Sequence, residues 1–227
     1  MTAYRRYGIY AVPHGAFYAT GAAWLGWDSV AGCTLAPPTV EGLPRPVAEM
    51  TATPRKYGFH GTVKPPFRLA DGMSETALRD AAAALCAGLA PVEIPALTLR
   101  RLGGFVAVVP ATPAEALAHL AAETVRRLDR FRAAPSQAEL DRRRKSGLSA
   151  RQEANLVQWG YPYVMEEFRF HMTLTGRLGE DADRVAERLR NLFTPVLPQP
   201  YRIDDLALVG EDAQGRFRVI QRYALSG

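Results

Sequence analysis

The feature of this 227-residue chain that most constrains its fold is a pair of matching segments whose histidines lie 111 positions apart. Residues 59–63 and 170–174 both read aromatic, His, any residue, Thr, apolar. Offsets of 109 and 112 positions separate two later pairs of apolar residues: Leu97 and Leu206, and Phe105 and Phe217. A near-constant offset indicates an internal duplication. We therefore expect two copies of a strand-helix-hairpin unit.

Hydrophobic periodicity and turn residues predict the elements of each copy. For the first copy they predict a strand at 57–67, a helix at 74–89, and strands at 92–102 and 105–109 that flank Gly103 and Gly104. For the second copy they predict a strand at 164–175, a helix at 181–193, and strands at 201–209 and 215–225. A strand at 4–12 and a helix at 15–25 precede both copies.

Three capping boxes predict helices between the two copies. Thr112 with Glu115 opens a helix that ends near residue 131, and two further helical pieces begin at Ser136 with Glu139 and at Ser149 with Gln152. The expected fold is α+β, with two antiparallel sheet lobes, helices outside and a central cleft. It forms one domain of residues 1–227, with the first motif in about 1–111, connector helices at 112–160 and the second motif in about 161–227.

Composition excludes several classes of protein. With 48% hydrophobic and 22% charged residues, the chain matches a folded soluble protein. No apolar run approaches the roughly 18 residues of a membrane span, and the apolar stretch near the start stops at Pro13, before a signal peptide could form. The two cysteines indicate neither a zinc motif nor a disulfide framework. We expect a cytoplasmic protein with no membrane association.

The net charge of +5 comes from one segment, because residues 126–151 hold nine basic and three acidic residues. This basic connector includes the run Arg142, Arg143, Arg144 and Lys145. It can attract anions such as RNA, but charge runs are more often the solvated faces of helices. We therefore expect neutralisation of the run to leave turnover within a few fold.

Strand periodicity places side chains i and i+2 on the same face. On this basis each histidine shares its face with a hydroxyl and a cation: His60 with Thr62 and Lys64, and His171 with Thr173 and Arg169. Across a cleft, the two sets supply a base, an acid, two hydroxyl donors and positive charge around an anion. In a single strand of this kind, the histidine is usually a buried residue that forms a hydrogen bond with its neighbouring threonine. Two matching frames favour a catalytic pair instead.

That inventory fits cleavage of a phosphodiester without a metal. A neutral imidazole can take a proton from the attacking water, and a protonated imidazole can give one to the leaving oxygen. The hydroxyl groups of Thr62 and Thr173 can bond the non-bridging oxygens, with Lys64 or Arg169 supplying charge. The residues alone do not tell which histidine is the acid.

Other features sharpen this hypothesis. Tyr163 shares the face of His171 and could stack on a base or sugar, although a strand-edge tyrosine is the more ordinary interpretation. Tyr57 falls on the face opposite His60 if the pleat continues. Gly61 lacks a side chain facing the core, which predicts a close neighbour there. No serine-hydrolase elbow, Walker loop, dinucleotide fingerprint or His-Glu-x-x-His motif is present, which disfavours those enzyme classes.

At these residues the sequence resembles the two-histidine (2H) phosphoesterase superfamily, which includes cyclic nucleotide phosphodiesterases and the 2'-5' RNA ligase-like proteins. Residues 54–60, 160–163 and 168–171 are similar to the branch often encoded with phosphonate-degradation genes. The resemblance implies a bilobal α+β fold and metal-independent opening of a cyclic phosphate, with a phosphorylated ribose as one candidate substrate. Carried over by position, it implies that His60 and His171 are catalytic and that Thr62 and Thr173 hold phosphate.

The predicted function is therefore that of a phosphodiesterase acting on a small cyclic phosphate of ribose or a nucleotide, with no cofactor. One alternative is a module that binds or processes RNA or a nucleotide through the basic connector. Another is a metal-dependent hydrolase, which is disfavoured because Glu166 and Glu167 are not in register with His171. The sequence leaves open the exact substrate, the direction of ring opening and the oligomeric state.

Overall fold

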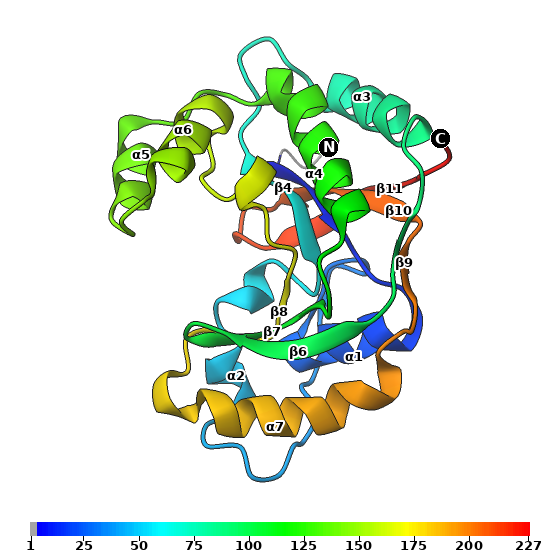
Figure 1. Ribbon diagram of the computed structural model, residues 1–227, viewed down its shortest axis with the longest axis vertical. Helices are drawn as coiled ribbons and strands as arrows, with labels where there is room; N and C mark the ends of the chain where they lie inside the picture. The colour runs from blue at the N-terminus through cyan, green and yellow to red at the C-terminus, as the bar shows by residue number, and fades with distance from the viewer. Residues whose placement is uncertain (1–3) are drawn as a thin grey trace.

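The computed structural model describes residues 4–227, which are built around one seven-stranded antiparallel sheet (Figure 1). The strand order is β11-β10-β1-β4-β8-β7-β6. Its strands are β1 (Tyr7–Ala11), β4 (Gly61–Phe67), β6 (Leu97–Leu102), β7 (Phe105–Pro110), β8 (Met172–Thr173), β10 (Asp205–Glu211) and β11 (Phe217–Ala224). Two small antiparallel pairs add β2 (Trp27–Asp28) with β3 (Cys33–Thr34), and β5 (Val92–Ile94) with β9 (Tyr201–Ile203).

The sheet has two halves, and each half combines parts of both copies of the duplicated unit. One half holds β4 of the first copy beside β1 and the β10–β11 hairpin of the second copy. The other half holds β8 of the second copy beside the β6–β7 hairpin of the first copy. The chain crosses between the halves at β5 and again at β9, and these two crossing strands pair with each other. Each copy therefore contributes its hairpin to the half of the sheet that holds the other copy's histidine strand, and β4 lies next to β8 where the halves meet.

The helices follow the same exchange. The α-helices are α1 (Gly15–Leu25), α2 (Val47–Met50), α3 (Glu75–Ala87), α4 (Glu115–Leu128), α5 (Gln137–Arg144), α6 (Ala150–Trp159) and α7 (Ala182–Phe193). Helix α3 packs against β10 and β11, and α4 packs against β4. Helix α7 packs against β6 and β7 (Figure 1). Helices α3 and α7 therefore each cover the hairpin that the other copy contributes.

Apolar side chains from these helices and one face of the sheet form the main core. Representative members are 1% exposed or less: Val63, Leu85, Met172, Leu189 and Leu208. The opposite face carries a smaller buried cluster that includes Tyr10 and Phe217. This second face also holds the candidate site.

The predicted α+β class, the order of elements and the hairpin at Gly103 are confirmed, and the φ of 57° at Gly103 lies in the region that favours glycine. The capping boxes at Ser136 and Ser149 are also formed. The predicted box at Thr112 is wrong: Ala114 is extended and caps α4 without a side-chain hydrogen bond. Among residues 4–227 no helix is long and apolar enough to cross a membrane.

Candidate active site

The two histidine frames meet in the middle of the sheet, where β4 and β8 are neighbours. The register of these strands pairs Gly61 with Met172. Extending this antiparallel register by one residue in each direction sets His60 opposite Thr173, and Thr62 opposite His171. Alternate side chains share a face, and directly opposed Cβ atoms lie about 4.5–5.5 Å apart. The two histidines and two threonines predicted from the motifs therefore form one compact group.

His60 is held by contacts on several sides. Its Nδ1 lies 2.9 Å from the carbonyl oxygen of Gly58, and its Nε2 lies 3.0 Å from Oγ1 of Thr62. The imidazole stacks on the ring of Tyr10, with ring centroids 3.6 Å apart and an interplanar angle of 14°. Tyr10 comes from β1, where it lies opposite Thr62. Strand β1 therefore supplies an aromatic surface under His60.

His171 has a more open setting. It precedes β8, which is two residues long. Its Nδ1 lies 2.7 Å from the carbonyl oxygen of Arg169. Its aromatic neighbour is Phe105 on β7, with ring centroids 5.9 Å apart and an interplanar angle of 52°. Within residues 4–227, Nε2 of His171 makes no hydrogen bond to a protein group.

The two frames orient their histidines in the same way. In each, the carbonyl group two residues before the histidine accepts a hydrogen bond from Nδ1. Because a carbonyl oxygen only accepts, Nδ1 must carry the hydrogen, and Nε2 is left as the nitrogen that can exchange a proton. Sequence reasoning missed this arrangement, because the carbonyl groups of Gly58 and Arg169 have no signature in the residue types.

The electrostatic settings of the two histidines differ. Burial lowers the pKa of His60 to about 4, and the positive charge of nearby His171 acts in the same direction. His60 is therefore neutral at neutral pH, with a lone pair on Nε2. A bound phosphate would raise this pKa, since an opposite charge favours the charged imidazole. These properties suit a proton acceptor that becomes more basic when an anion binds.

The prediction that Lys64 shares the face of His60 is not supported by the strand register. The pairing of β1 with β4 shifts between Ile9 and Tyr10, as in a β-bulge. Thr62 lies opposite Tyr10, whereas Lys64 lies opposite Ile9, which belongs to the main core. The irregularity breaks the alternation on which the prediction depended.

The ammonium group of Lys64 is buried at the end of α4. It donates to the carbonyl oxygen of Val125 at 3.2 Å and lies 3.4 Å from Oδ1 of Asp129. Burial lowers the pKa of Lys64 to about 8. Arg132 binds the same Asp129 carboxylate, at 2.8 and 3.0 Å. Lys64 therefore ties strand β4 to α4, away from the histidine pair.

Arg169 is exposed and is held by its own loop. Its Nη1 donates to the carbonyl oxygens of Glu166 (2.9 Å) and Phe168 (2.8 Å). The predicted strand at 164–175 is reduced to Met172–Thr173, and a 3-10 helix occupies Met165–Glu167. The alternation assumed for Arg169 therefore does not extend to it.

Tyr10 and Tyr57 lie near His60, and the sequence predicted the positions of the tyrosines poorly. Tyr57 was expected on the opposite face, but Pro54–Lys56 form a 3-10 helix, and the ring of Tyr57 lies 6.4 Å from that of His60. Tyr163 is 44% exposed and packs edge-on against Tyr161, with ring centroids 5.8 Å apart. Tyr10 was missed, because only the pairing of β1 with β4 brings it here.

Gly61 has the close neighbour that its sequence predicted. A Cβ atom at this position would collide with the ring of Phe170, which belongs to the second frame. The strands β4 and β8 can therefore approach only because the first frame has glycine between its histidine and threonine.

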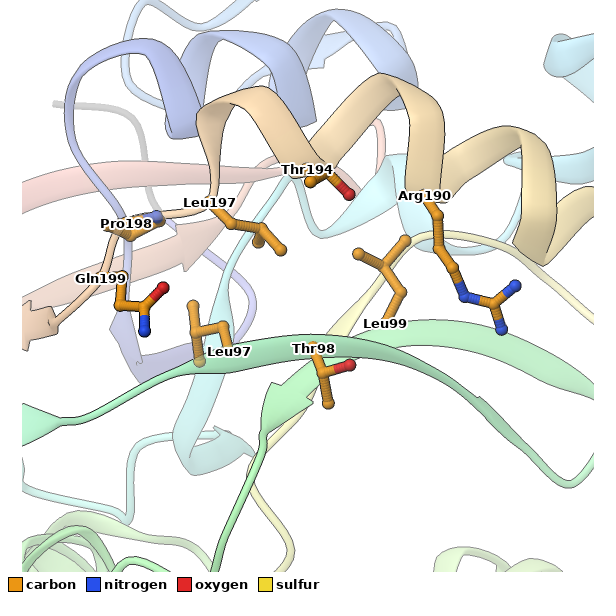
Figure 2. Close-up of a pocket in the computed structure, with 8 residues that line it drawn as sticks. All are labelled: Leu97, Thr98, Leu99, Arg190, Thr194, Leu197, Pro198 and Gln199. Atoms are coloured by element: carbon orange, nitrogen blue, oxygen red, sulfur yellow. The ribbon is translucent and has the colours of Figure 1, made fainter.

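A cavity of about 300 Å³ lies elsewhere, between edge strand β6 and the end of α7 (Figure 2). It is lined by Leu97, Thr98, Leu99, Arg190, Thr194, Leu197, Pro198 and Gln199. None of these is a histidine or a carboxylate, so the cavity does not belong to the histidine group. Within residues 4–227, no cluster of three or more His, Cys, Asp or Glu side chains could hold a metal ion.

Distant similarities to solved structures cover nearly the whole chain. A crystal structure of a phosphoesterase is 14% identical over 99% of this chain and 100% of that one, with a TM-score of 0.48. E. coli LigT complexed with NADP+ is 13% identical over 100% of both chains, with a TM-score of 0.47. The same protein complexed with 3'-AMP has a TM-score of 0.46 and 14% identity, over 99% of this chain and 100% of that one.

Curated relatives are closer in sequence but longer. A protein of Janthinobacterium sp. (strain Marseille), named ribose 1,5-bisphosphate phosphokinase PhnN, is 36% identical over 98% of this chain and 51% of its own length. A protein of Laribacter hongkongensis (strain HLHK9) with the same name is 35% identical over 92% of this chain and 49% of its own length. The chain thus spans about half the length of the curated relatives it matches.

A family model matches residues 62–218, which include His171, both threonines and most of the sheet. Its description is "Protein of unknown function (DUF1045)". The matched segment is more than half of the 227 residues. The chain is a member of the DUF1045 family.

Proposed function

We propose that this protein is a phosphodiesterase that opens a small cyclic phosphate by acid–base catalysis between His60 and His171. The observation that carries the proposal is the β4–β8 register, which sets each histidine opposite the threonine of the other frame. Both Nδ1 atoms are engaged by carbonyl groups, so proton transfer falls to the two Nε2 atoms, of which that of His60 lies 3.0 Å from Oγ1 of Thr62. A phosphate placed between them has a base on one side and an acid on the other.

His60 is the base in this proposal, because its low pKa keeps Nε2 unprotonated. Nε2 of His60 takes a proton from a water molecule, whose oxygen forms a new bond to phosphorus. The P–O bond to one ring oxygen breaks, and protonated Nε2 of His171 gives its proton to that oxygen. Water is thereby split across the P–O bond, and the product is a phosphate monoester beside a free hydroxyl group.

Thr62 and Thr173 hold the non-bridging oxygens. In the free protein the hydroxyl of Thr62 can donate to Nε2 of His60, which lies 3.0 Å away. When phosphate binds, the same hydroxyl can turn to a phosphate oxygen, which frees Nε2 for water. Donors aimed at charge that grows in the transition state lower the barrier more than equal donors in water.

The names of the relatives suggest the sugar. Those longer proteins are named for ribose 1,5-bisphosphate. If a cyclic phosphate joins O1 of ribose 5-phosphate to a neighbouring oxygen, opening the ring at that neighbouring oxygen leaves ribose 1,5-bisphosphate. The kinase activity itself is not proposed for this chain, since its three lysines lie outside any Walker loop. We place the substrate among cyclic phosphates of ribose 5-phosphate, in keeping with the resemblance to phosphonate-linked proteins.

A substrate panel tests the proposal. It contains ribose cyclic phosphates with and without a 5-phosphate, 2',3'-cyclic nucleotides and short RNAs, and phosphorus NMR reads the products. We expect turnover of a ribose cyclic phosphate to a monoester, with no loss of activity in EDTA. Activity that disappears in EDTA and returns with zinc or manganese would favour the metal-dependent alternative. Failure of the wild-type protein to open any cyclic phosphate in the panel would refute the proposal.

A further inference from the structure

Tyr57 borders the histidine site and has no part in the acid–base step described above. Its ring lies 6.4 Å from the imidazole of His60, measured between centroids, at an interplanar angle of 43°. It packs against the smaller buried cluster on the second face of the sheet, the face that also carries His60. A role for Tyr57 must therefore be sought in what lies beside the reacting group.

The ring of Tyr57 is held by a buried neighbour. It stacks on the ring of Phe217, with centroids 5.2 Å apart and an interplanar angle of 21°. Phe217 is 0% exposed, and its ring also lies 5.9 Å from that of Tyr10, which stacks on His60. Because Phe217 supports one face of the ring, the orientation of Tyr57 beside His60 is set before a ligand arrives.

One backbone turn, residues 54–58, positions both Tyr57 and His60. The side chain of Arg55 anchors this turn by donating to two backbone carbonyl oxygens, at 2.8 and 2.9 Å. The turn ends at Gly58, whose φ of 74° lies in the region that favours glycine. The carbonyl oxygen of Gly58 is the acceptor for Nδ1 of His60. The phenol ring and the imidazole are therefore held by the same short segment.

Tyr57 has a group that the protein does not use. The residue is half-buried, and within residues 4–227 its hydroxyl group makes no hydrogen bond to a protein group. The corresponding residue of the other frame, three positions before His171, is Phe168, which packs against the main core and has no hydroxyl. The exposed combination of an apolar ring and a polar tip thus occurs beside His60 and not at the matching position before His171.

We propose that Tyr57 is a specificity-determining residue that binds the sugar of the substrate beside His60. In a sugar cyclic phosphate the phosphorus is joined through two oxygens to the sugar itself, so a phosphate held at Nε2 of His60 brings the sugar against the neighbouring side chains. A sugar offers carbon-bound hydrogens on its faces and hydroxyl groups at its edge. The ring of Tyr57 can pack against the former, and its hydroxyl can donate to or accept from the latter.

This inference rests on the proposed function, because it names the part of the same substrate that a residue outside the histidine pair recognises. It predicts that the protein distinguishes cyclic phosphates of sugars from those of simple diols. A ligand site of this kind uses an aromatic wall and a few polar groups to fix orientation, whereas the acid–base pair needs only the phosphate.

Kinetics on two matched substrates test it: a ribose cyclic phosphate, and the cyclic phosphate of propane-1,2-diol, which keeps the five-membered phosphate ring and lacks the sugar. Tyr57→Phe loses one neutral hydrogen bond and should lower kcat/KM about 3- to 10-fold on the first substrate. Tyr57→Leu loses the ring as well and should lower it about 10- to 100-fold. On the second substrate both variants should stay within about threefold of wild type, since the contact they lose is to the sugar.

Tyr223→Phe is the matched control. It removes a phenol hydroxyl from the main core, on the opposite face of the sheet, where that hydroxyl is buried without a partner. It should change kcat/KM on neither substrate.

An equal loss on both substrates would show that Tyr57 acts through its packing around His60, and no loss on either would show that it touches no substrate. Either result overturns the inference and leaves the proposed function standing.

Calorimetry provides a readout that needs no turnover. Wild type should bind ribose 5-phosphate more tightly than inorganic phosphate. Tyr57→Phe should weaken binding of ribose 5-phosphate about 3- to 10-fold and leave binding of inorganic phosphate unchanged. That pattern supports the sugar contact even if no cyclic phosphate is opened, a result that would refute the proposed function alone. Equal affinity of wild type for the two ligands would reject the sugar contact.

Discussion

The two histidine frames share their residues but not their surroundings. His60 precedes the seven-residue strand β4, which has β1 on one side and β8 on the other. His171 precedes a two-residue strand between β4 and β7. Tyr10 stacks on the imidazole of His60, whereas the ring of Phe105 is tilted relative to that of His171, with ring centroids 5.9 Å apart. One motif therefore sits in two environments, and the difference comes from the extra strand β1.

This asymmetry is the basis of the chemical roles proposed for the two histidines. In the proposed mechanism the buried imidazole of His60, whose pKa is depressed, stays neutral and accepts a proton, and the other imidazole donates one. The repeated sequence pattern alone leaves the roles open, because it is the same in both frames. The strand outside the duplication breaks the symmetry. In this proposal the duplication supplies the two histidines, and β1 gives them different environments and therefore different roles.

The largest expected effect tests whether both frames act. His60→Ala and His171→Ala should each lower kcat by about 10²- to 10⁴-fold on the best substrate, because each removes a positioned acid or base. The double variant should lose much less than the product of the two, since both groups serve one step. Rates and thermal unfolding measured side by side separate catalysis from stability. A single variant with near wild-type turnover would contradict the paired mechanism.

The second prediction concerns the residue between histidine and threonine, which is glycine in one frame and methionine in the other. Gly61→Ala should lower the free energy of unfolding by about 1–3 kcal/mol, because the new Cβ collides with Phe170. Met172→Ala should lower it by about 2–5 kcal/mol for a different reason, since it leaves a cavity in the core. Denaturant unfolding measures both.

A double variant distinguishes overpacking from cavity formation. Phe170→Leu should relieve part of the cost of Gly61→Ala and should add to the cost of Met172→Ala. If the losses of unfolding free energy are additive in both double variants, the Phe170 ring is not what excludes a larger side chain at position 61.

The fold was largely predictable, because its signals are periodic. Apolar spacing located α1, α3 and α7, and the repeated order of elements indicated two lobes. The exchange of hairpins between lobes was not predictable, since pairing of β10 with β1 and of β7 with β8 depends on contacts between distant segments. The strand predicted at 164–175 was too long: residues 165–167 form a 3-10 helix, and the alternating residues 168–171 lie outside any strand.

The site was predictable where the side chain follows directly from the motif. Thr62 and Thr173 lie on the adjacent strands β4 and β8, and His60 and His171 directly precede them, so pleating and this one strand pairing place the four together. Lys64 was misplaced by the register shift beside Ile9, which has no sequence signature. Tyr10 was missed for the same kind of reason, since it comes from β1 and reaches His60 only through strand pairing.

The third prediction tests the environment of His60 through pH. Activity should follow a bell, and the acid limb of kcat/KM should lie well below 6.5 because the pKa of His60 is about 4. The base works only when neutral, so activity is lost as pH falls through that limb. The acid limb of kcat should lie higher, since bound phosphate raises the pKa.

Replacement of the stacked ring should move this limb. Tyr10→Leu opens His60 to water and should raise the acid limb of kcat/KM by about one pH unit. Tyr10→Phe keeps the ring and should leave the limb in place. Phe105→Leu, beside His171, is the matched control in the other frame. If Phe105→Leu moves the acid limb and Tyr10→Leu does not, the roles assigned to the two histidines are reversed.

The smallest expected effect concerns the connector, which precedes the second frame and has no counterpart before the first. The triple variant Arg142→Gln, Arg144→Gln and Lys145→Gln keeps Arg143, whose guanidinium lies over the ring of Tyr161. The variant's turnover of small substrates should stay within a few fold of wild type. Arg144 is already paired with Glu153, and the other two side chains are exposed, so none of the three is directed at Tyr161. If the run instead follows an RNA backbone, the triple variant should flatten the salt dependence of RNA binding by about one log unit per lost phosphate contact. Tight, steeply salt-dependent RNA binding that disappears in the triple variant would make the connector a polynucleotide surface and shift the proposed function towards RNA processing.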